Sequence, residues 1–377
     1  MTINSKIFFV STLKNSIWGG SEELWYLSAL EFVESGYEVH VLVYDFGYLN
    51  DKLKNLKSKG VQIHKKSRKD KLFYRLLLKF GLFNWWLNPY KVLKTINPDI
   101  IVITDGATYY TSDDNNLSKI LIKYFPQKYN IICQGNSQYH IPKNRINAIE
   151  LFTKAGKVFF VSDRNKEECF HQLAFNLENS LVIQNPINIE IKNIAPLPVI
   201  NDFIHIALIG RLEIAEKGQD VIIKMLSREF WKKSNCRFHI FGTGKDESYL
   251  KKLIQYYGVE ELVKIEGVKD ITKIWKECQV LLLPSLIEGT SLSMLEALCL
   301  GRICIVSNVG GASEWIEDGL NGFLVDWPTE ELIEQKLKIA LNEENNWNQI
   351  SKNARESVMS KIDVNPGKSL FNYLTYS

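Results

Sequence analysis

Residues 280–326 constrain the fold of this 377-residue chain more than any other stretch. Two continuous apolar runs, at 280–283 and 303–306, have the pattern of strands buried on both faces of a parallel sheet. Between them, apolar residues recur at helical spacing over 292–300, and Gly301 follows as a helix stop. The stretch therefore predicts a strand, helix, strand unit, and ligands of such units bind beyond the carboxyl ends of the strands.

Two glutamates flank the start of the predicted helix. Glu288 lies in the preceding loop, and Glu296 follows eight residues later, where Ser293 and Glu296 have capping-box spacing. Carboxylates on both sides of a helix N-terminus accept hydrogen bonds from hydroxyls, while the free N–H groups bind a diphosphate. This combination suits a sugar nucleotide. The plainer alternative is a solvated loop charge at Glu288 and only a capping partner at Glu296.

The sequence EGTSLSMLEALCLGRICIVSNVGGASEWIEDGLNGFLVD, residues 288–326, resembles the donor-site signature of retaining glycosyltransferases of family 4. The resemblance implies the α/β GT-B fold, in which two Rossmann-like doubly wound parallel-sheet domains face each other across a cleft. It also implies transfer with retention of configuration, with Glu288 on the donor sugar hydroxyls and Glu296 on the ribose. The backbone groups expected to bind the diphosphate are those of Gly289, Thr290, Ser291 and Leu292.

Length and composition predict a globular protein with two domains. Hydrophobic residues make up 45% and charged residues 24%, and a formal charge of +3 implies no nucleic-acid partner. The six cysteines form no C-x-x-C pair, and we expect buried thiols in a reducing compartment. No apolar run is long enough to span a bilayer, and the start does not resemble a signal peptide. We therefore expect a cytoplasmic protein.

The first half opens with a strand at 6–10, a loop containing Gly19 and Gly20, a helix at 21–35 and a strand at 39–44, the opening of a doubly wound domain. Adjacent glycines permit either close backbone approach to a ligand or a tight turn. The family usually carries a glycine pair here, facing the cleft. Further strands are predicted at 100–104, 130–133, 157–162 and 181–184.

Residues 65–94 contain nine lysines and arginines and one aspartate, interleaved with leucines and aromatic residues. A basic amphipathic helix of this kind fits an element attracted to anionic lipid, which would place the protein at the inner face of the membrane as a peripheral contact. The alternative is a helix packed on the sheet with a solvated basic face.

After the strand at 130–133, the family commonly places a histidine near the donor sugar. This chain instead has Gln134 at the closest position, and His140 stands six residues later. Gln134 is the expected counterpart, while His140 suits an ordinary loop histidine better, because a catalytic role depends on geometry.

The second half begins with a strand at 205–209, followed by a loop in which Arg211 and Lys217 stand six residues apart. Two such cations can bind a diphosphate, although exposed basic loops are common. The family has its diphosphate-binding GR…KG loop here, which assigns this role to both residues. Val268 ends the strand predicted at 263–268, which occupies the place where the family's backbone meets the nucleotide base.

The predicted organisation is an N-terminal acceptor-side domain at 1–190, a linker at 191–202, a donor domain at 203–360 and a helix at 361–377 that packs back on the first domain.

No D-x-D triplet occurs, so we expect neither a metal nor a cofactor. The expected substrates are a nucleoside-diphosphate sugar, UDP-linked by preference, and a glycan or lipid-linked acceptor of surface polysaccharide or glycolipid synthesis. The alternatives are a non-catalytic nucleotide-sugar-binding scaffold and another GT-B activity such as a sugar-nucleotide epimerase.

Overall fold

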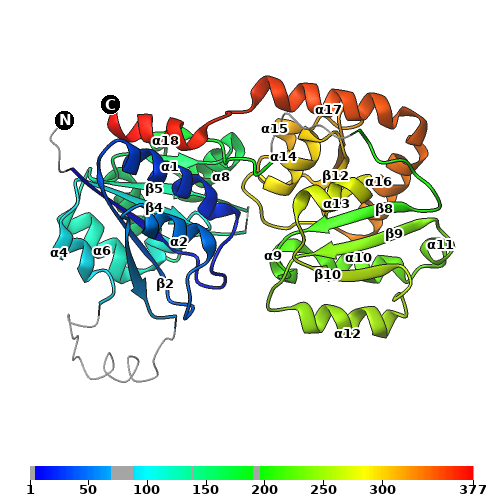
Figure 1. Ribbon diagram of the computed structural model, residues 1–377, viewed down its shortest axis with the longest axis horizontal. Helices are drawn as coiled ribbons and strands as arrows, with labels where there is room; N and C mark the ends of the chain where they lie inside the picture. Colours follow the sequence, from blue (N-terminus) through cyan, green and yellow to red (C-terminus); the bar gives the residue numbers. More distant parts are fainter. Residues whose placement is uncertain (1–4, 69–87, 138, 190–195, 377) are drawn as a thin grey trace. The chain divides into compact units, whose positions relative to one another are not determined.

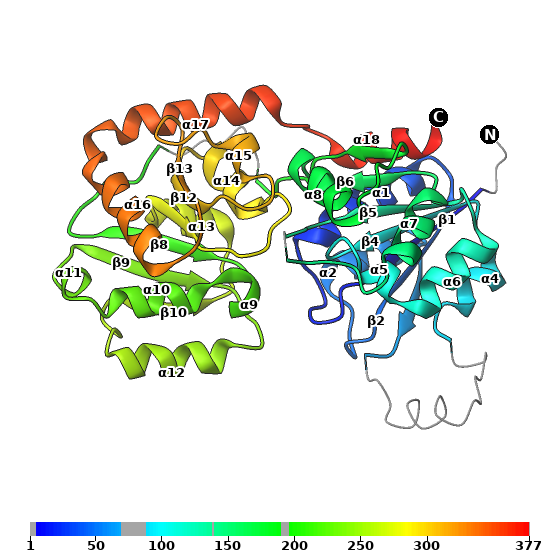
Figure 2. The ribbon, with the colours of Figure 1, turned by 180° about the vertical axis from the view of Figure 1, so that it is seen from behind.

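The computed structural model describes residues 5–68, 88–137, 139–189 and 196–376. The chain divides into two compact units: unit 1 runs to Pro186 and resumes at Asp363–Ser377, and unit 2 is Ile187–Ile362. Each unit is a parallel sheet with helices on both faces (Figure 1, Figure 2).

The sheet of unit 1 has seven parallel strands in the order β3-β2-β1-β4-β5-β6-β7. Its strands are β1 (Lys6–Ser11), β2 (Glu38–Tyr44), β3 (Gln62–Lys66), β4 (Ile100–Asp105), β5 (Tyr129–Cys133), β6 (Val158–Phe160) and β7 (Ser180–Val182). In the register, Ile7 of β1 is aligned with Val39 of β2 and with Ile100 of β4. The central strands are apolar at nearly every position because helices cover both of their faces.

Two layers of helices cover this sheet. One layer contributes Leu24, Leu53 and Leu370 to the apolar core on its face, and the other contributes Leu117 and Leu151 to the opposite core. The helical elements of unit 1 are η1 (Gly20–Glu22), α1 (Glu23–Glu34), α2 (Asp51–Ser58), α4 (Lys91–Ile96), α5 (Tyr110–Asp113), α6 (Asn115–Tyr124), α7 (Arg145–Thr153), α8 (Asp163–Leu173) and α18 (Pro366–Thr375).

Helix α18 returns from the end of the chain and packs on α1 of unit 1 (Figure 1). The rings of Phe371 and Phe32 have centroids 4.7 Å apart. The helix begins with Pro366, a favoured first residue, and the side chain of Asn365 accepts a hydrogen bond from the N–H group of Lys368. The apolar residues of the C-terminal segment are therefore used in the core of unit 1.

The sheet of unit 2 has six parallel strands in the order β10-β9-β8-β11-β12-β13. Its strands are β8 (Ile204–Ile209), β9 (Cys236–Phe241), β10 (Val263–Gly267), β11 (Val280–Leu283), β12 (Ile303–Ser307) and β13 (Phe323–Val325). Strands β8 and β11 are neighbours although residues 210–279 lie between them in the sequence, and Val280 is aligned with Ile206. The loops that follow β8 and β11 therefore leave the same edge of the sheet.

Helices also cover both faces of the second sheet. Ile222, Leu250 and Leu337 contribute to the core on one face, and Leu295 and Ala354 contribute to the core on the other. The helical elements are α9 (Ile214–Lys217), α10 (Gln219–Leu226), α11 (Glu229–Lys232), α12 (Glu247–Tyr257), α13 (Ile271–Glu277), α14 (Leu292–Cys299), α15 (Ala312–Trp315), α16 (Glu330–Asn342), η3 (Glu344–Asn346) and α17 (Trp347–Lys361).

The predicted fold class is confirmed, since both sheets are parallel and doubly wound. Two short edge strands, β3 and β13, were absent from the sequence prediction. Strand β3 has the largely polar sequence QIHKK, and β13 has only three residues, so neither has the long apolar run of a central strand. The contacts divide the chain at Pro186, ahead of the predicted linker at 191–202, of which residues 191–195 lie outside the described part.

All six cysteines are buried free thiols, as expected from the sequence. Burial raises the pKa of several of them, for example that of Cys236 to about 11. Within the described residues, no helix is both long and apolar enough to cross a membrane. Most of the basic stretch, residues 69–87, lies outside the described residues, so its predicted amphipathic helix stays a prediction.

Candidate functional site

The loop after β8 carries the first of the two predicted diphosphate-binding cations. The guanidinium of Arg211 is paired with Glu213 and with Glu216, the latter at 2.5 Å. The amide of Gln219 donates to the backbone oxygen of Arg211 at 2.7 Å. Two carboxylates fix one guanidinium here, which orders the loop. A diphosphate that binds Arg211 would compete with both carboxylates for its guanidinium.

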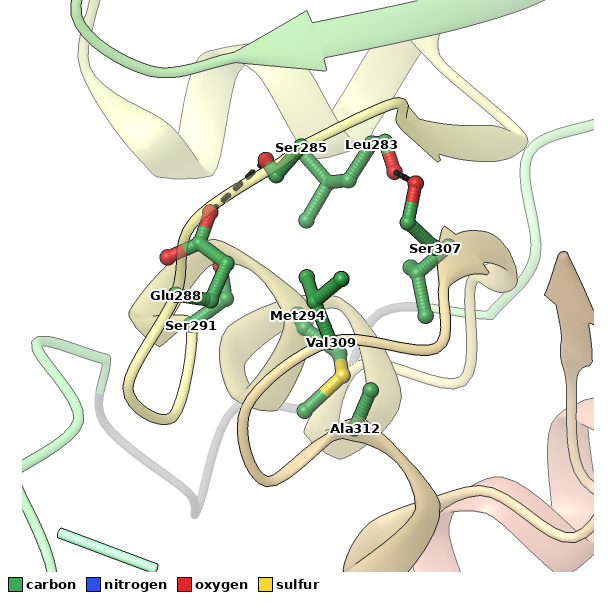
Figure 3. Close-up of a pocket in the computed structure, with 9 residues that line it drawn as sticks. Leu283, Ser285, Glu288, Ser291, Met294, Ser307, Val309 and Ala312 are labelled. Atoms are coloured by element: carbon green, nitrogen blue, oxygen red, sulfur yellow. Dashed lines mark hydrogen bonds between the residues drawn. The ribbon is translucent and has the colours of Figure 1, made fainter. Parts of the chain in front are cut away.

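Lys217 ends the short helix α9, and its Nζ lies 2.6 Å from Oε1 of Glu288. Ser285 Oγ donates to the same oxygen at 2.8 Å (Figure 3). The side chains of Lys217 and Glu288 are only 17% and 15% exposed. Because a partly buried ion pair is weakly screened, it fixes its two side chains more firmly than a surface pair does. Two residues that the sequence assigned to the donor are thus in direct contact.

A glycine explains how the two loops come so close. Gly218 directly follows Lys217 and has φ +62°, and a Cβ at this position would lie 2.3 Å from the backbone oxygen of Pro284. Any side chain would therefore push the loop of Lys217 away from the loop of Glu288. The backbone N–H of Leu286 also donates to the oxygen of Glu216 at 2.8 Å. These contacts fix the spacing of Lys217 and Glu288.

Helix α14 begins at Leu292, and its N-cap residue is Ser291, whose side chain makes no capping hydrogen bond. The predicted capping box of Ser293 and Glu296 is wrong. Ser293 already lies inside the helix, and its hydroxyl donates to the oxygen of Ile209 at 3.4 Å and lies 3.0 Å from the hydroxyl of Ser291. The first N–H groups of a helix have no partner within the helix, so this N-terminus can bind an anion.

Glu296 is buried in the first turns of α14. Its Oε1 accepts a hydrogen bond of 3.3 Å from the backbone N–H of Asn188, near the start of unit 2. The ribose role inferred from the resemblance stays a prediction for this residue. Val268, in contrast, is 77% exposed immediately after β10, and no described contact ties its side chain to the other residues of the site.

A small pocket opens between Glu288, the start of α14 and the end of β12 (Figure 3). The side chain of Met294 lies at its floor, with Val309 and Ala312 beside it, while Ser285 and Glu288 stand at its edge. Sequence reasoning did not find this pocket, because its lining comes from two segments, 283–294 and 306–312, that only the fold brings together.

In unit 1, Gln134 follows β5 and is buried. Its Oε1 accepts a hydrogen bond of 2.7 Å from the amide of Asn185, while its Nε2 has no partner among the described residues. His140 lies near the rings of Tyr109 and Tyr110, with centroids at 5.6 and 5.8 Å. Gln134 therefore carries a buried donor group that a ligand can satisfy, whereas His140 is packed against aromatic rings.

Gly19 has an extended backbone, and Gly20 opens η1, where the oxygen of Gly19 accepts the N–H of Glu22 at 3.0 Å. The sequence reasoning missed Glu22 itself. Burial raises the pKa of this carboxyl to about 7, although hydrogen bonds from Ser11 and Trp25 oppose the shift. A carboxyl two residues after the glycine pair was the only available signal.

Two more buried ionisable groups lie at the same edge of the first sheet and were not predicted. Burial raises the pKa of Asp105, the last residue of β4, to about 7, and lowers the pKa of Lys66, the last residue of β3, to about 8. Oδ1 of Asp105 has no hydrogen-bond partner among the described residues. Shifted groups of this kind mark functional sites and structural charge networks alike.

Among the described residues, no three His, Cys, Asp or Glu side chains are grouped so that they could hold a metal ion. Arg211, Lys217 and the start of α14 lie at the edge of the second sheet and are of the chemical types that bind a diphosphate.

Comparison with known proteins finds a family model and several relatives that match this chain. Residues 191–357 match the family model of glycosyl transferases group 1. The chain is 25% identical over 334 residues to an uncharacterized glycosyltransferase of Methanocaldococcus jannaschii, which covers 85% of this chain and 84% of that protein. It is 22% identical over 295 residues to the N,N'-diacetylbacillosaminyl-diphospho-undecaprenol alpha-1,3-N-acetylgalactosaminyltransferase of Campylobacter jejuni, over 71% of this chain and 74% of that protein.

Among solved structures, Anabaena HepE in complex with UDP and glucose superposes with a TM-score of 0.72 at 17% identity, over 99% of this chain and 100% of that chain. WaaG, a glycosyltransferase involved in lipopolysaccharide biosynthesis, superposes with a TM-score of 0.71 at 14% identity, over 98% and 100% of the two chains. Residues 191–357 thus match the glycosyl transferases group 1 family, and the chain has the GT-B fold.

Proposed function

We propose that this protein transfers a sugar from a nucleoside-diphosphate sugar, with UDP as the favoured nucleotide, to a glycan or lipid-linked acceptor. The reaction retains the anomeric configuration and needs no metal ion. The observation that carries the proposal is the contact of Lys217 with Glu288 at 2.6 Å, beside Arg211 and the start of α14. Two cations and a helix N-terminus suit a diphosphate, and the carboxylate suits sugar hydroxyls.

The proposed chemistry is electrostatic. When the bond between the sugar and the diphosphate breaks, negative charge grows on the leaving oxygen. Lys217, Arg211 and the N–H groups at the start of α14 stabilise that charge, since they are positioned before the reaction starts. Glu288 accepts hydrogen bonds from the sugar and fixes its orientation. Gln134, whose Nε2 has no described partner, is proposed to donate to the sugar or the acceptor.

The proposed acceptor class rests on the relatives. The Campylobacter relative is named for a lipid diphosphate acceptor, and a Staphylococcus aureus relative, 24% identical over 71% of this chain and 53% of its own length, is a poly(ribitol-phosphate) alpha-N-acetylglucosaminyltransferase. We infer a role in surface polysaccharide or glycolipid synthesis. The basic residues 65–94 would then attract the chain to the inner face of the membrane.

The test is thermal unfolding of the wild type in the presence of UDP, GDP, ADP or CMP. A ligand at about 100 times its dissociation constant adds about 2.7 kcal/mol to the free energy of unfolding, which raises the melting temperature measurably. We expect UDP to stabilise the wild type and to lose this effect in Lys217→Ala. Lys251→Ala, which removes an exposed lysine of α12, is the matched control and should keep the effect.

Transfer is then measured with sugar donors that carry the nucleotide found to stabilise the chain, and with lipid-linked acceptors. Product that contains the acceptor supports the proposal, and an altered sugar nucleotide without acceptor would favour an epimerase. Binding without any turnover would favour a scaffold protein. If no nucleotide stabilises the wild type, the assignment of the site is wrong.

A further inference from the structure

The pocket beneath Glu288 has an apolar floor and a polar edge (Figure 3). Its apolar lining is formed by the buried side chains of Leu283, Met294, Val306, Val309 and Ala312. Three hydroxyl groups, those of Ser285, Ser291 and Ser307, surround it together with Glu288. Such a division of apolar and polar groups is typical of a site that binds a small group with one apolar end.

The pocket is small. Its interior has room for about one group of water or methyl size, which excludes a sugar ring. Because Glu288 lies at the edge, a sugar that hydrogen-bonds to this carboxylate would place one of its substituents over the floor. The pocket is thus suited to a substituent of the donor sugar.

The chemistry of the floor restricts that substituent. A hydroxyl or hydroxymethyl group placed among Leu283, Met294 and Val309 would lose its hydrogen bonds to water and gain none. A methyl group loses nothing there and fills the space. The serine hydroxyls at the edge can donate or accept, and Ser285 already donates to Glu288 at 2.8 Å. An amide one bond away from a methyl group satisfies both requirements.

We propose that this pocket binds the methyl end of an acetamido substituent, so that the donor is a nucleotide-linked acetamido sugar. The proposal rests on the function proposed above and names the donor class. A deoxy sugar would also bring a methyl group, but its methyl is attached directly to the ring and brings no amide to the hydroxyl groups of the polar edge. The hydroxyl groups of Ser285 and Ser291 therefore favour the acetamido group.

The experiment compares donors that differ only in this substituent, namely UDP-GlcNAc with UDP-glucose and UDP-GalNAc with UDP-galactose, by calorimetric titration. If another nucleoside diphosphate stabilises the chain, the pairs are made on that nucleotide. Hydrophobic pockets discriminate a missing methyl-sized group by about 10- to 200-fold. We expect the wild type to bind one of the two acetamido donors more tightly than its hydroxyl counterpart, by a factor of this size.

Two variants assign the preference to the pocket. Ala312→Val adds methyl groups to the floor and should remove the preference, while UDP alone binds as before. Met294→Ala enlarges the floor and should improve binding of an N-propionyl donor relative to the N-acetyl donor. Met225→Ala, which truncates an equally buried methionine on α10 on the opposite face of the sheet, is the control and should change neither ratio.

Each outcome decides the proposal. Equal binding of acetamido and hydroxyl donors by a wild type that binds UDP would overturn it, while the proposed transferase function would stand. A preference that persists in Ala312→Val, in a variant that still melts cooperatively and binds UDP, would also overturn it. Failure of every nucleotide and sugar nucleotide to bind would instead contradict the proposed function itself.

Discussion

Nζ of Lys217 lies 2.6 Å from Oε1 of Glu288, although 71 positions separate the two residues. The contact joins the loop after β8 to the loop after β11, and these strands are neighbours in the sheet. A diphosphate that binds Lys217 would replace Glu288 as the partner of this lysine. The Glu288 carboxylate could then accept hydrogen bonds from the sugar. We propose that binding of the donor exchanges one partner of Lys217 for another.

Loss of either member of this pair should reduce transfer strongly. We expect Lys217→Ala and Glu288→Gln each to lower kcat/KM by about 100- to 1,000-fold, the usual effect of removing one group that stabilises developing charge. Release of nucleoside diphosphate in the presence of acceptor measures this. Lys251→Ala should keep the wild-type rate, and full turnover in both site variants would show that the pair has no catalytic role.

Gly218 should be essential for the site because it lies against the backbone of Pro284, and not only because of its positive φ. Gly218 and Gly258 have nearly the same φ, +62° and +61°, but only at Gly218 would a Cβ meet a backbone atom, at 2.3 Å. Gly258→Ala should cost only the left-handed penalty of about 1 to 2 kcal/mol. Gly218→Ala should cost more and should also weaken UDP binding.

Denaturant unfolding and UDP titration of these two alanine variants separate the effects. Equal losses of stability, with UDP binding intact in both, would mean that the close approach of the loop to Pro284 does not hold the site together.

The fold and part of the site could be predicted from the sequence. Apolar runs such as 280–283 indicate buried parallel strands, and the carboxyl ends of such strands lie at one edge. The partners of Arg211 and Glu296 could not be predicted in this way. Glu213 and Glu216 are close to Arg211 in the sequence, but their spacing does not show which way the guanidinium points. The N–H of Asn188 reaches Glu296 across 108 positions, and local spacing carries no record of that approach.

The burial of ionisable side chains could not be predicted from the sequence either. Asp105 ends an apolar strand, so its place at the sheet edge follows from the pattern, but its complete burial depends on the elements packed around it. The sequence pattern identifies a carboxylate at the end of a strand, but it does not show how exposed that carboxylate is to solvent.

Asp105 should make the stability of unit 1 depend on pH. Burial raises the pKa of this carboxyl from 3.8 to about 7, so the folded state holds a proton that the unfolded state releases. The stability that this proton contributes is full below pH 3.8 and is lost as the pH rises through about 7. The loss is on the order of 1.4 kcal/mol per pH unit within this window.

Asp105→Asn removes this ionisation while keeping the side-chain shape. Its free energy of unfolding, relative to wild type, should therefore be higher at pH 7.5 than at pH 4.5, as measured by chemical denaturation. Asp202→Asn, at an exposed position, is the control and should show no such trend. A variant that loses the same stability at both pH values would contradict the raised pKa.

The C-terminal helix should stabilise unit 1. Phe371 is buried against Phe32, whereas Tyr376, five residues later, is 70% exposed. Phe371→Ala should cost about 3 to 5 kcal/mol, the usual range for a buried phenylalanine, and Tyr376→Ala much less. Hydrogen exchange assigns the loss to a unit: amides of β1 and β2 should exchange faster, while those of β8 and β11 should not. Uniform acceleration in both sheets would contradict this assignment.

The most direct test of the account is calorimetric titration of UDP and of its preferred sugar nucleotide into wild type, Lys217→Ala and Glu288→Gln. We assign the diphosphate to Lys217 and the sugar to Glu288. Lys217→Ala should therefore bind neither ligand well, while Glu288→Gln should bind UDP at least as tightly as wild type, because its Lys217 no longer has a carboxylate partner, and should lose the added affinity of the sugar. Equal loss of both ligands in both variants, or no loss in either, would contradict the central claim.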